Sequence, residues 1–320
     1  MPLDADLLAR PPDARAHAPA SLSNLGPGFD ALGLAIEGLG DTVEAWRADE
    51  GGVRVVASHE GAAWALAPAE RNTAAIAAAA VLKMTGAAGG LVLRITKGVT
   101  PGSGLGSSAA SAVAGALAAN AAVGGAFAKE DVVEAVLEGE AAASGAWHGD
   151  NVLPALFGGL VLVSSTDPTR YRRLTLGAPL HLALLLPSVQ VLTKAARAML
   201  PSSVPLRDAV SNATSLAFLL GALQSGDADE AGRCIMQDRL VEPVRATLVP
   251  CYEAARRAAL DAGAFGCALS GSGPAMFALC RSPLHAARVA DVMREASEAH
   301  GISALAHATA TCDRGAYADA

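Results

Sequence analysis

The chain has 320 residues, of which 52% are hydrophobic and 4% aromatic, and its formal net charge is −7. This length suits one large or two medium domains with an ample core. The acidic balance argues against a nucleic-acid surface, and no uncharged apolar run reaches membrane length. We therefore expect a soluble, cytoplasmic protein that binds neither nucleic acid nor a membrane.

The cysteines are widely spaced, and no Cys-x-x-Cys pair occurs among them. Their spacing indicates neither a zinc site nor a disulfide framework. We expect reduced, mostly buried thiols at Cys234, Cys251, Cys267, Cys280 and Cys312.

The N-terminal part begins with residues 1–15, which lack the apolar core of a signal peptide and are expected to form a loose leader. An extended segment, residues 16–21, leads into a turn in which Asn24 and Asp30 bracket Gly-Pro-Gly. Residues 31–36 then continue as an apolar strand. On turn chemistry alone, these polar side chains would satisfy turn amides.

Further strands and one helix are predicted next. Residues 42–46 and 53–58 alternate enough to be strands of an antiparallel meander. The alanine-rich residues 72–85 are typical of a buried helix, and Asn72 suits its N-cap. Residues 91–96 form an apolar strand. Lys97 follows this strand. Two interpretations of Lys97 are open: it offsets the charge of a bound phosphate, or it is a solvated surface lysine.

A glycine-rich segment between this strand and a small-residue helix at 108–123 is the centre of the chain. Glycines let backbone amides approach an anion, and the first turn of a helix offers unpaired N–H groups. The absence of Gly-Lys-Ser/Thr excludes a Walker A loop, and Ser107 stands where the dinucleotide pattern needs glycine. The hydroxyls of Ser107 and Ser108 can cap the helix or reach a metal. The segment comprises Pro101, Gly102, Ser103, Gly104, Leu105, Gly106, Ser107 and Ser108.

Residues 129–144 are predicted as a helix with Val132, Val133, Val136 and Leu137 inward. Its acidic side is typical of a solvated face and consists of Glu130, Glu134, Glu138 and Glu140. Eight residues after Glu140 begins the polar segment His148-Gly149-Asp150-Asn151.

The second half alternates helices and strands, which predicts a two-layer α+β arrangement after a turn-rich boundary at 164–168. Arg197 follows Thr193-Lys194 in a short helix that proline ends, and Arg245 lies in Glu-Pro-x-Arg. Surface arginines are the ordinary interpretation of both. The turn at 270–274 contains Ser272 and Gly273 between two apolar strands.

Three of these segments together resemble the GHMP kinases (galactokinase, homoserine, mevalonate and phosphomevalonate kinases). They are the Pro-x-x-x-Gly-Leu-Gly-Ser-Ser-Ala-Ala loop, residues 19–30 and the glycine turn at 270–274. Thr-Lys-x-x-Arg, Glu-Pro-x-Arg and His-x-Asp-Asn are further similar to segments of the homoserine kinases. The chain departs from them at Leu22-Ser23, usually Ser-Ala, and at Gly149, usually proline. The resemblance covers residues 16–312.

The resemblance implies an α+β fold of two domains. Residues 16–165 would form an N-terminal ATP-binding domain like that of a small-subunit ribosomal protein. Residues 166–320 would form a two-layer, ferredoxin-like substrate domain. The implied reaction transfers the γ-phosphoryl group of ATP to the side-chain hydroxyl of L-homoserine, on the route to threonine. ATP and Mg²⁺ are the implied cofactors, and a homodimer is implied.

The resemblance also implies roles for individual residues. The residues expected at ATP are Asn72, Lys97, the loop from Pro101 to Ser108, Ser272 and Gly273, with Ser108 and Glu140 on Mg²⁺. The residues expected at homoserine are Asn24, Asp30, His148, Asp150, Thr193, Arg197 and Arg245.

Within this substrate set, Asp30 is expected to bind the ammonium group. Arg197 and Arg245 are expected at the carboxylate, because a guanidinium fork suits a planar carboxylate. Asn24 and Asn151 are the residues expected at the reacting hydroxyl. Several GHMP kinases use an aspartate there, whereas Asn151 cannot accept a proton. We therefore expect the γ-phosphate itself to accept it, since a loose transition state needs little deprotonation of the nucleophile.

Three alternatives remain open on the sequence alone. Another GHMP kinase, of the mevalonate or shikimate type, would share the loops but would not need the paired arginines. A non-catalytic sensor of ATP or an amino acid is possible if Glu140 or Ser108 is misplaced. A serine hydrolase built on Ser107 or Ser108 with His148 and Asp150 is disfavoured, because Gly-x-Ser-x-Gly is absent.

Overall fold

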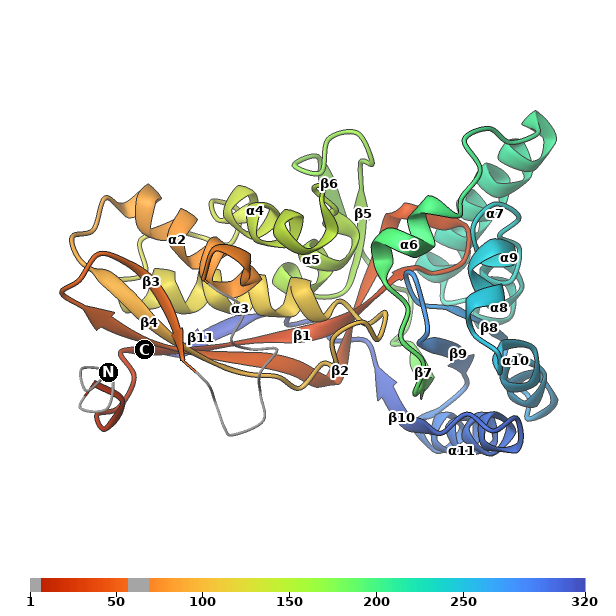
Figure 1. Cartoon of the computed structure of the whole chain (residues 1–320). Helices are drawn as coiled ribbons and strands as arrows, with labels where there is room; N and C mark the ends of the chain where they lie inside the picture. The colour runs from red at the N-terminus through yellow and green to blue at the C-terminus, as the bar shows by residue number, and fades with distance from the viewer. Residues whose placement is uncertain (1–6, 57–68, 320) are drawn as a thin grey trace.

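Two β-sheets carry the helices of the protein in a computed structural model that describes residues 7–56 and 69–319 (Figure 1). The first sheet has the order β11-β1-β2-β4-β3, with β5 added to β2 and β6 to β5. The second has the order β10-β7-β9-β8. The strands are β1 (Ala14–Asn24), β2 (Gly28–Ala48), β3 (Gly52–Val56), β4 (Gly90–Thr96), β5 (Leu160–Val163), β6 (Tyr171–Leu174), β7 (His181–Pro187), β8 (Gly266–Leu269), β9 (Met276–Cys280), β10 (Ala304–Ala310) and β11 (Tyr317–Asp319).

The long strand β2 organises the first sheet because it pairs with β1, β4 and β5. The predicted antiparallel meander is wrong. Residues 42–46 belong to β2, and β3 pairs with β4 in parallel. Parallel strands need a crossover connection, and α2 (Thr73–Thr85) lies between these two strands in the chain. Residues 57 and 58 of the predicted second strand lie outside the described residues.

Four helices cover one face of this sheet: α2, α3 (Ser107–Ala122), α4 (Val133–Ser144) and α5 (Gly149–Phe157) (Figure 1). Their small residues allow unusually close packing. A Cβ added at Gly115 of α3 would lie 2.5 Å from the Ala74 carbonyl oxygen of α2. Asn72 caps α2 as predicted, and its side chain accepts a hydrogen bond from the Ala75 N–H at 3.2 Å. The alanine-rich composition thus serves helix-to-helix contact.

Helices α10 (Tyr252–Asp261) and α11 (Pro283–Ala299) pack with the second sheet around a separate apolar cluster. The remaining elements are α6 (Thr193–Ala198), α7 (Leu206–Ser225), α8 (Ala228–Ile235), α9 (Glu242–Arg245) and the short 3₁₀ turns η2 (Ala69–Arg71) and η3 (Ala246–Leu248). In the described chain, no helix is both long and apolar enough to cross a membrane. All five cysteines are free thiols, and only Cys312 is not buried.

The two sheets do not divide the chain at one point. The predicted boundary at residue 165 falls between β5 and β6, which pair with each other in the first sheet. The C-terminal strand β11 pairs with β1. The predicted leader is partly held to the same sheet, because Ala14 begins β1 and the Trp46 indole donates to the Arg10 carbonyl oxygen at 3.0 Å. Residues 1–6 lie outside the described residues.

Candidate active site

A cavity of ≈ 520 Å³ lies where the glycine-rich loop, α3 and the turn between β8 and β9 meet. It brings together residues from both halves of the chain. The predicted site residues that line it are Asn24, Asp30, Asn72, Lys97, Pro101, Gly102, Gly104, Gly106, Ser107, Ser108, Glu140, His148, Asp150, Asn151, Thr193, Arg197, Arg245 and Ser272. Ser103, Leu105 and Gly273 do not line it.

The glycine-rich loop depends on glycine for its shape. Gly102, Gly104 and Gly106 have φ values of 71°, 84° and 68°, in the left-handed region that glycine adopts without strain. A Cβ at Gly106 would lie 2.3 Å from the Ser21 hydroxyl oxygen. Gly106 precedes α3, whose N-terminus has no side-chain cap. No side chain therefore caps the first N–H groups of α3, and such an uncapped helix N-terminus is a favourable place for an anion.

Two predicted loop residues serve the loop itself and do not face the cavity. The Ser103 carbonyl oxygen accepts a hydrogen bond from the Ala275 N–H at 2.9 Å, and Leu105 is buried in the core. The Ser270 hydroxyl donates to the Gly104 carbonyl oxygen at 2.6 Å. The glycine turn of the second half thus fixes the loop of the first half.

Lys97 is not a solvated surface lysine. Its ammonium group forms a buried ion pair with Asp41 and donates to the Ser107 carbonyl oxygen at 2.7 Å and the Ser111 hydroxyl at 3.0 Å. Burial lowers the pKa of Lys97, and Asp41 opposes that shift. Lys97 therefore ties the end of β4 to the first turn of α3 at the edge of the cavity.

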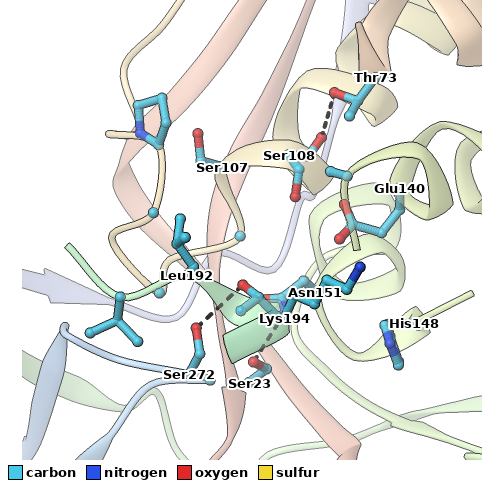
Figure 2. Close-up of a pocket in the computed structure, with 18 of the residues that line it drawn as sticks. Ser23, Thr73, Ser107, Ser108, Glu140, His148, Asn151, Leu192, Lys194 and Ser272 are labelled. Atoms are coloured by element: carbon cyan, nitrogen blue, oxygen red, sulfur yellow. Dashed lines mark hydrogen bonds between the residues drawn. The ribbon is translucent and has the colours of Figure 1, made fainter. Parts of the chain in front are cut away.

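Ser108 and Glu140 face the same part of the cavity from α3 and α4 (Figure 2). Glu130, Glu134 and Glu138 are exposed as expected, whereas Glu140 is buried. Burial raises the pKa of Glu140 to about 7, although its hydrogen bond with Ser108 and the charge of Lys97 oppose the shift. A carboxylate and a hydroxyl are hard oxygen donors of the kind that Mg²⁺ takes.

The two arginines lie close to one aromatic ring. The Arg197 and Arg245 guanidinium carbons are 5.2 and 5.0 Å from the centroid of Phe29. Arg197 donates to both carboxylate oxygens of Asp30, at 2.9 and 2.7 Å. Arg245 is buried, and one of its terminal nitrogens donates to the Gly271 carbonyl oxygen at 2.8 Å. The surface interpretation of Arg245 is therefore wrong.

The two asparagines are held in place by neighbouring polar groups. Asn24 has a φ of 71°, and its side-chain amide donates to the Gly271 carbonyl oxygen at 3.2 Å. The Asn151 side chain donates to the Ser23 hydroxyl at 3.0 Å (Figure 2). It also accepts from the Ser21 hydroxyl at 2.9 Å. Asn151 is thus a fixed amide between β1 and the loop.

Burial also shifts the titration of His148 and Asp150. Burial raises the pKa of Asp150 to about 7, the charge of Asp30 raises it further, and Arg197 opposes both. Burial lowers the pKa of His148, and the charge of Arg197 lowers it further. These shifts favour the uncharged forms of both groups.

Several residues of the site were missed by sequence reasoning. Ser23 and Phe29 lie inside the motif at 19–30, next to the predicted site residues Asn24 and Asp30, so their position in the sequence could have identified them. Asp41 and Ser111 carry no such signal, because their partners are remote in the sequence. The missed residues that line the cavity are Ser23, Arg71, Thr73, Ile95, Ser111, Ala143, Val191, Leu192, Lys194 and Gly271.

Comparison with known protein families agrees with the glycine-rich loop and the two-part cavity described above. The GHMP kinases N terminal domain matches residues 72–159, and GHMP kinases C terminal matches residues 219–299. The fold and the loop are those of a GHMP kinase, which confirms the predicted α+β class.

Individual relatives narrow this class. Homoserine kinase of Pyrococcus furiosus is 42% identical over 91% of this chain and 95% of its own length. Homoserine kinase of Arabidopsis thaliana is 42% identical over 88% of this chain and 78% of its own. The crystal structure of homoserine kinase from Cytophaga hutchinsonii has a TM-score of 0.90 and 38% identity, covering 96% of this chain and 98% of its own. The chain therefore belongs to the homoserine kinases of the GHMP kinase family.

Proposed function

We propose that this protein transfers the γ-phosphoryl group of ATP to the side-chain hydroxyl of L-homoserine, a step of threonine biosynthesis. The observation that carries this proposal is a single cavity with a phosphate-binding loop at one side and Asp30, Arg197 and Arg245 at the other. A kinase for a zwitterionic alcohol needs these two sets of groups side by side.

ATP is assigned to the side formed by the loop and α2. The triphosphate lies against the glycines at 102–106 and the N-terminus of α3, where backbone N–H groups favour an anion. Asn72 lines the same side of the cavity, and we assign the adenine to it. Ser272, in the glycine turn whose Ser270 bonds to the loop, also lines the cavity.

Mg²⁺ is assigned to Ser108 and Glu140, whose oxygen atoms fit it. No group of three or more His, Cys, Asp or Glu side chains suited to a metal occurs among residues 7–56 and 69–319. This suits Mg²⁺, which is commonly held by one or two protein groups together with substrate phosphates. When bound, the ion neutralises charge on the transferring phosphoryl group.

Homoserine is assigned to the arginine side. Its carboxylate takes the guanidinium groups of Arg245 and Arg197, and its ammonium group takes Asp30. The direct pairing of Arg197 with Asp30 supports this assignment, because an amino acid offers each of them a partner of opposite charge. His148, Asp150 and Thr193 line the same cavity as these groups and the loop.

The reaction depends on positioning more than on proton abstraction. Asn24 orients the hydroxyl, and the fixed amide of Asn151 holds the adjoining wall. A loose phosphoryl-transfer transition state makes little demand on a general base, so alignment and charge stabilisation supply most of the rate. The γ-phosphate accepts the hydroxyl proton in this proposal.

Turnover of a substrate panel tests the proposal. ADP release is measured with ATP, Mg²⁺ and, in turn, L-homoserine, L-threonine, L-serine, mevalonate, shikimate and galactose. We expect a strong preference for homoserine and loss of turnover with EDTA. Turnover of mevalonate or a sugar in preference to homoserine contradicts the substrate assignment. Absence of turnover with every alcohol favours a sensor of ATP or an amino acid.

The homodimer and the cytoplasmic location belong to the same proposal. They are supported by the family to which the chain belongs. Sedimentation of the purified chain checks the first, and fractionation of cells checks the second.

A further inference from the structure

The short helix α9 contains Arg245 and is too short to be stable without contacts to the rest of the protein. It contains four residues, whereas isolated helices shorter than about 12–15 residues are marginal in water. Arg245 lines the active-site cavity, and Glu242 lines a second cavity of ≈ 550 Å³. The orientation of Arg245 therefore depends on what anchors α9 to the rest of the protein.

Two carboxylates supply that anchorage. Glu242 Oε1 accepts hydrogen bonds from the Tyr252 hydroxyl at 2.5 Å and from the Leu269 N–H at 3.0 Å. The Asp238 carboxylate accepts from the backbone N–H groups of Leu240, Val241 and Glu242, at 2.9, 3.2 and 2.8 Å. Asp238 thus fixes the entry to the helix, while Glu242 joins the helix to β8 and α10.

The contact with Leu269 leads back to the active site. Leu269 ends β8, and two residues later the Gly271 carbonyl oxygen accepts from Arg245 at 2.8 Å and from Asn24 at 3.2 Å. Glu242 therefore connects α9 to the strand end that also holds the Arg245 guanidinium. The bond from the Leu269 N–H to Glu242 and the bond from Arg245 to the Gly271 carbonyl oxygen thus join both ends of α9 to the same segment, residues 269–271.

We propose that Glu242 is a positioning residue for substrate recognition, which holds α9 against β8 so that Arg245 stays over the Phe29 ring. Glu242 does not line the active-site cavity and touches no substrate in this proposal. The inference deepens the proposed function and rests on it, because it needs Arg245 to bind a substrate carboxylate.

The state of Glu242 agrees with this role. Burial raises the pKa of its carboxyl to about 7, and the hydrogen bonds from Tyr252 and Leu269 oppose the shift. In both of these hydrogen bonds, Glu242 Oε1 is the acceptor. A glutamine carbonyl oxygen can accept the same two bonds, so Glu242→Gln separates hydrogen bonding from charge.

Steady-state kinetics of three variants test the proposal. We expect Glu242→Ala to raise KM for homoserine about tenfold and to leave KM for ATP within about twofold, since a lost positioning bond acts on one substrate. Glu242→Gln stays within about threefold of the wild type for both substrates. The matched control is Glu253→Ala, because Glu253 is exposed and lines the same second cavity; it leaves both constants unchanged.

A double-mutant comparison gives the decisive result. In an Arg245→Ala background, Glu242→Ala causes no further loss in kcat/KM for homoserine, because the two residues act as a unit. Homoserinol, which lacks the carboxylate, is turned over equally by the wild type and Glu242→Ala. Equal rises in both KM values, or additive losses in the double variant, overturn the proposal.

A second variant keeps the proposal testable if Glu242→Ala does not fold. Tyr252→Phe removes one of the two hydrogen bonds to Glu242 and keeps the aromatic ring in the core. We expect it to raise KM for homoserine about threefold and to leave KM for ATP unchanged. An unchanged KM for homoserine in this variant overturns the positioning role.

Failure of the proposed function is a separate outcome. If the wild type prefers another carboxylate-bearing alcohol over homoserine, the substrate assignment fails. The Glu242 variants are then compared on that alcohol, and a selective rise of its KM still supports the positioning role.

Discussion

The two sides of the active-site cavity are built in different ways. The part of the ATP side assigned to the triphosphate is one continuous segment, residues 101–108, whose shape depends on glycines at positive φ. The substrate side is assembled from β2, α5, α6, α9 and the β8–β9 turn, which are far apart in the sequence. A contiguous site can be perturbed at one backbone position, whereas an assembled site depends on the contacts between its parts.

The largest effect is expected on the ATP side, from Gly106→Ala. The new Cβ would meet the Ser21 hydroxyl oxygen at 2.3 Å and the Asn151 side-chain oxygen at 2.9 Å, at a φ of +68°. We expect kcat/KM to fall more than about 100-fold for both substrates, because displacement of reacting groups by about 1 Å has effects of this size. Initial-rate kinetics with each substrate varied in turn measure it.

The matched control for this substitution is Gly124→Ala. Gly124 follows the same helix at its far end and has a positive φ of 112°, but nothing lies within 4 Å of a Cβ placed there. It should lose only about 1–2 kcal/mol of stability from the left-handed backbone and keep its activity. Equal activity losses in the two variants would contradict the assignment of Gly106 to the site.

The substrate side should respond more selectively. Arg245→Ala is expected to reduce kcat/KM for homoserine about 30- to 100-fold, because it removes a buried charged donor. Arg197→Ala is expected to reduce it about tenfold, since the Arg197 side chain is 37% exposed and its pairing with Asp30 is weakened by solvent. KM for ATP should change little in either variant.

A reversed order would change the assignment of the two arginines. If Arg197→Ala has the larger effect, Arg197 and not Arg245 supplies the main carboxylate contact. An equal loss for ATP and homoserine would show that the arginines support the fold of the whole cavity. Thermal melts of both variants separate that outcome from a loss of binding.

The smallest expected effect is on stability, from Asp150→Asn. The Asp150 carboxyl has a pKa of about 7 in the folded protein against an ordinary value of 3.8, so the folded state binds its proton more tightly. The stability that this group contributes is therefore full below about pH 4 and is lost as the pH rises to about 7. In melts at several pH values, the Tm of the variant should fall less than that of the wild type over this range. If the Tm of Asp150→Asn falls with pH as steeply as the Tm of the wild type, the prediction is wrong.

The contiguous parts of the molecule were predictable from sequence, and the assembled parts were predictable only through family resemblance. Asn72 as a helix cap and the loop before α3 follow from local chemistry. The burial of Glu140 on an otherwise exposed acidic face does not, because it depends on where α4 packs against α3. The ion pair of Lys97 with Asp41 joins residues 56 positions apart and left no local pattern.

The pairing of β3 with β4 shows the same limit. Alternation predicted a strand at residues 53–58, of which residues 53–56 lie in β3, but the direction of its partner depends on the α2 crossover between them. Similarly, the glycine-rich spacing located the turn at 270–274 without indicating that Ser270 would bond to Gly104. Local patterns therefore locate elements, and tertiary contacts decide what the elements meet.

The pairing of β11 with β1 has a consequence for the order in which the protein is made. Residues 15–17 are synthesised early, but their outer edge is covered by residues 317–319, which emerge from the ribosome long afterwards (Figure 1). The Cys312 N–H also bonds to the Ala35 carbonyl oxygen at 2.9 Å. During translation the first sheet therefore keeps an open strand edge along β1, which invites pairing with other chains. The first sheet is complete only after the strands of the second sheet, β7 to β10, have been synthesised.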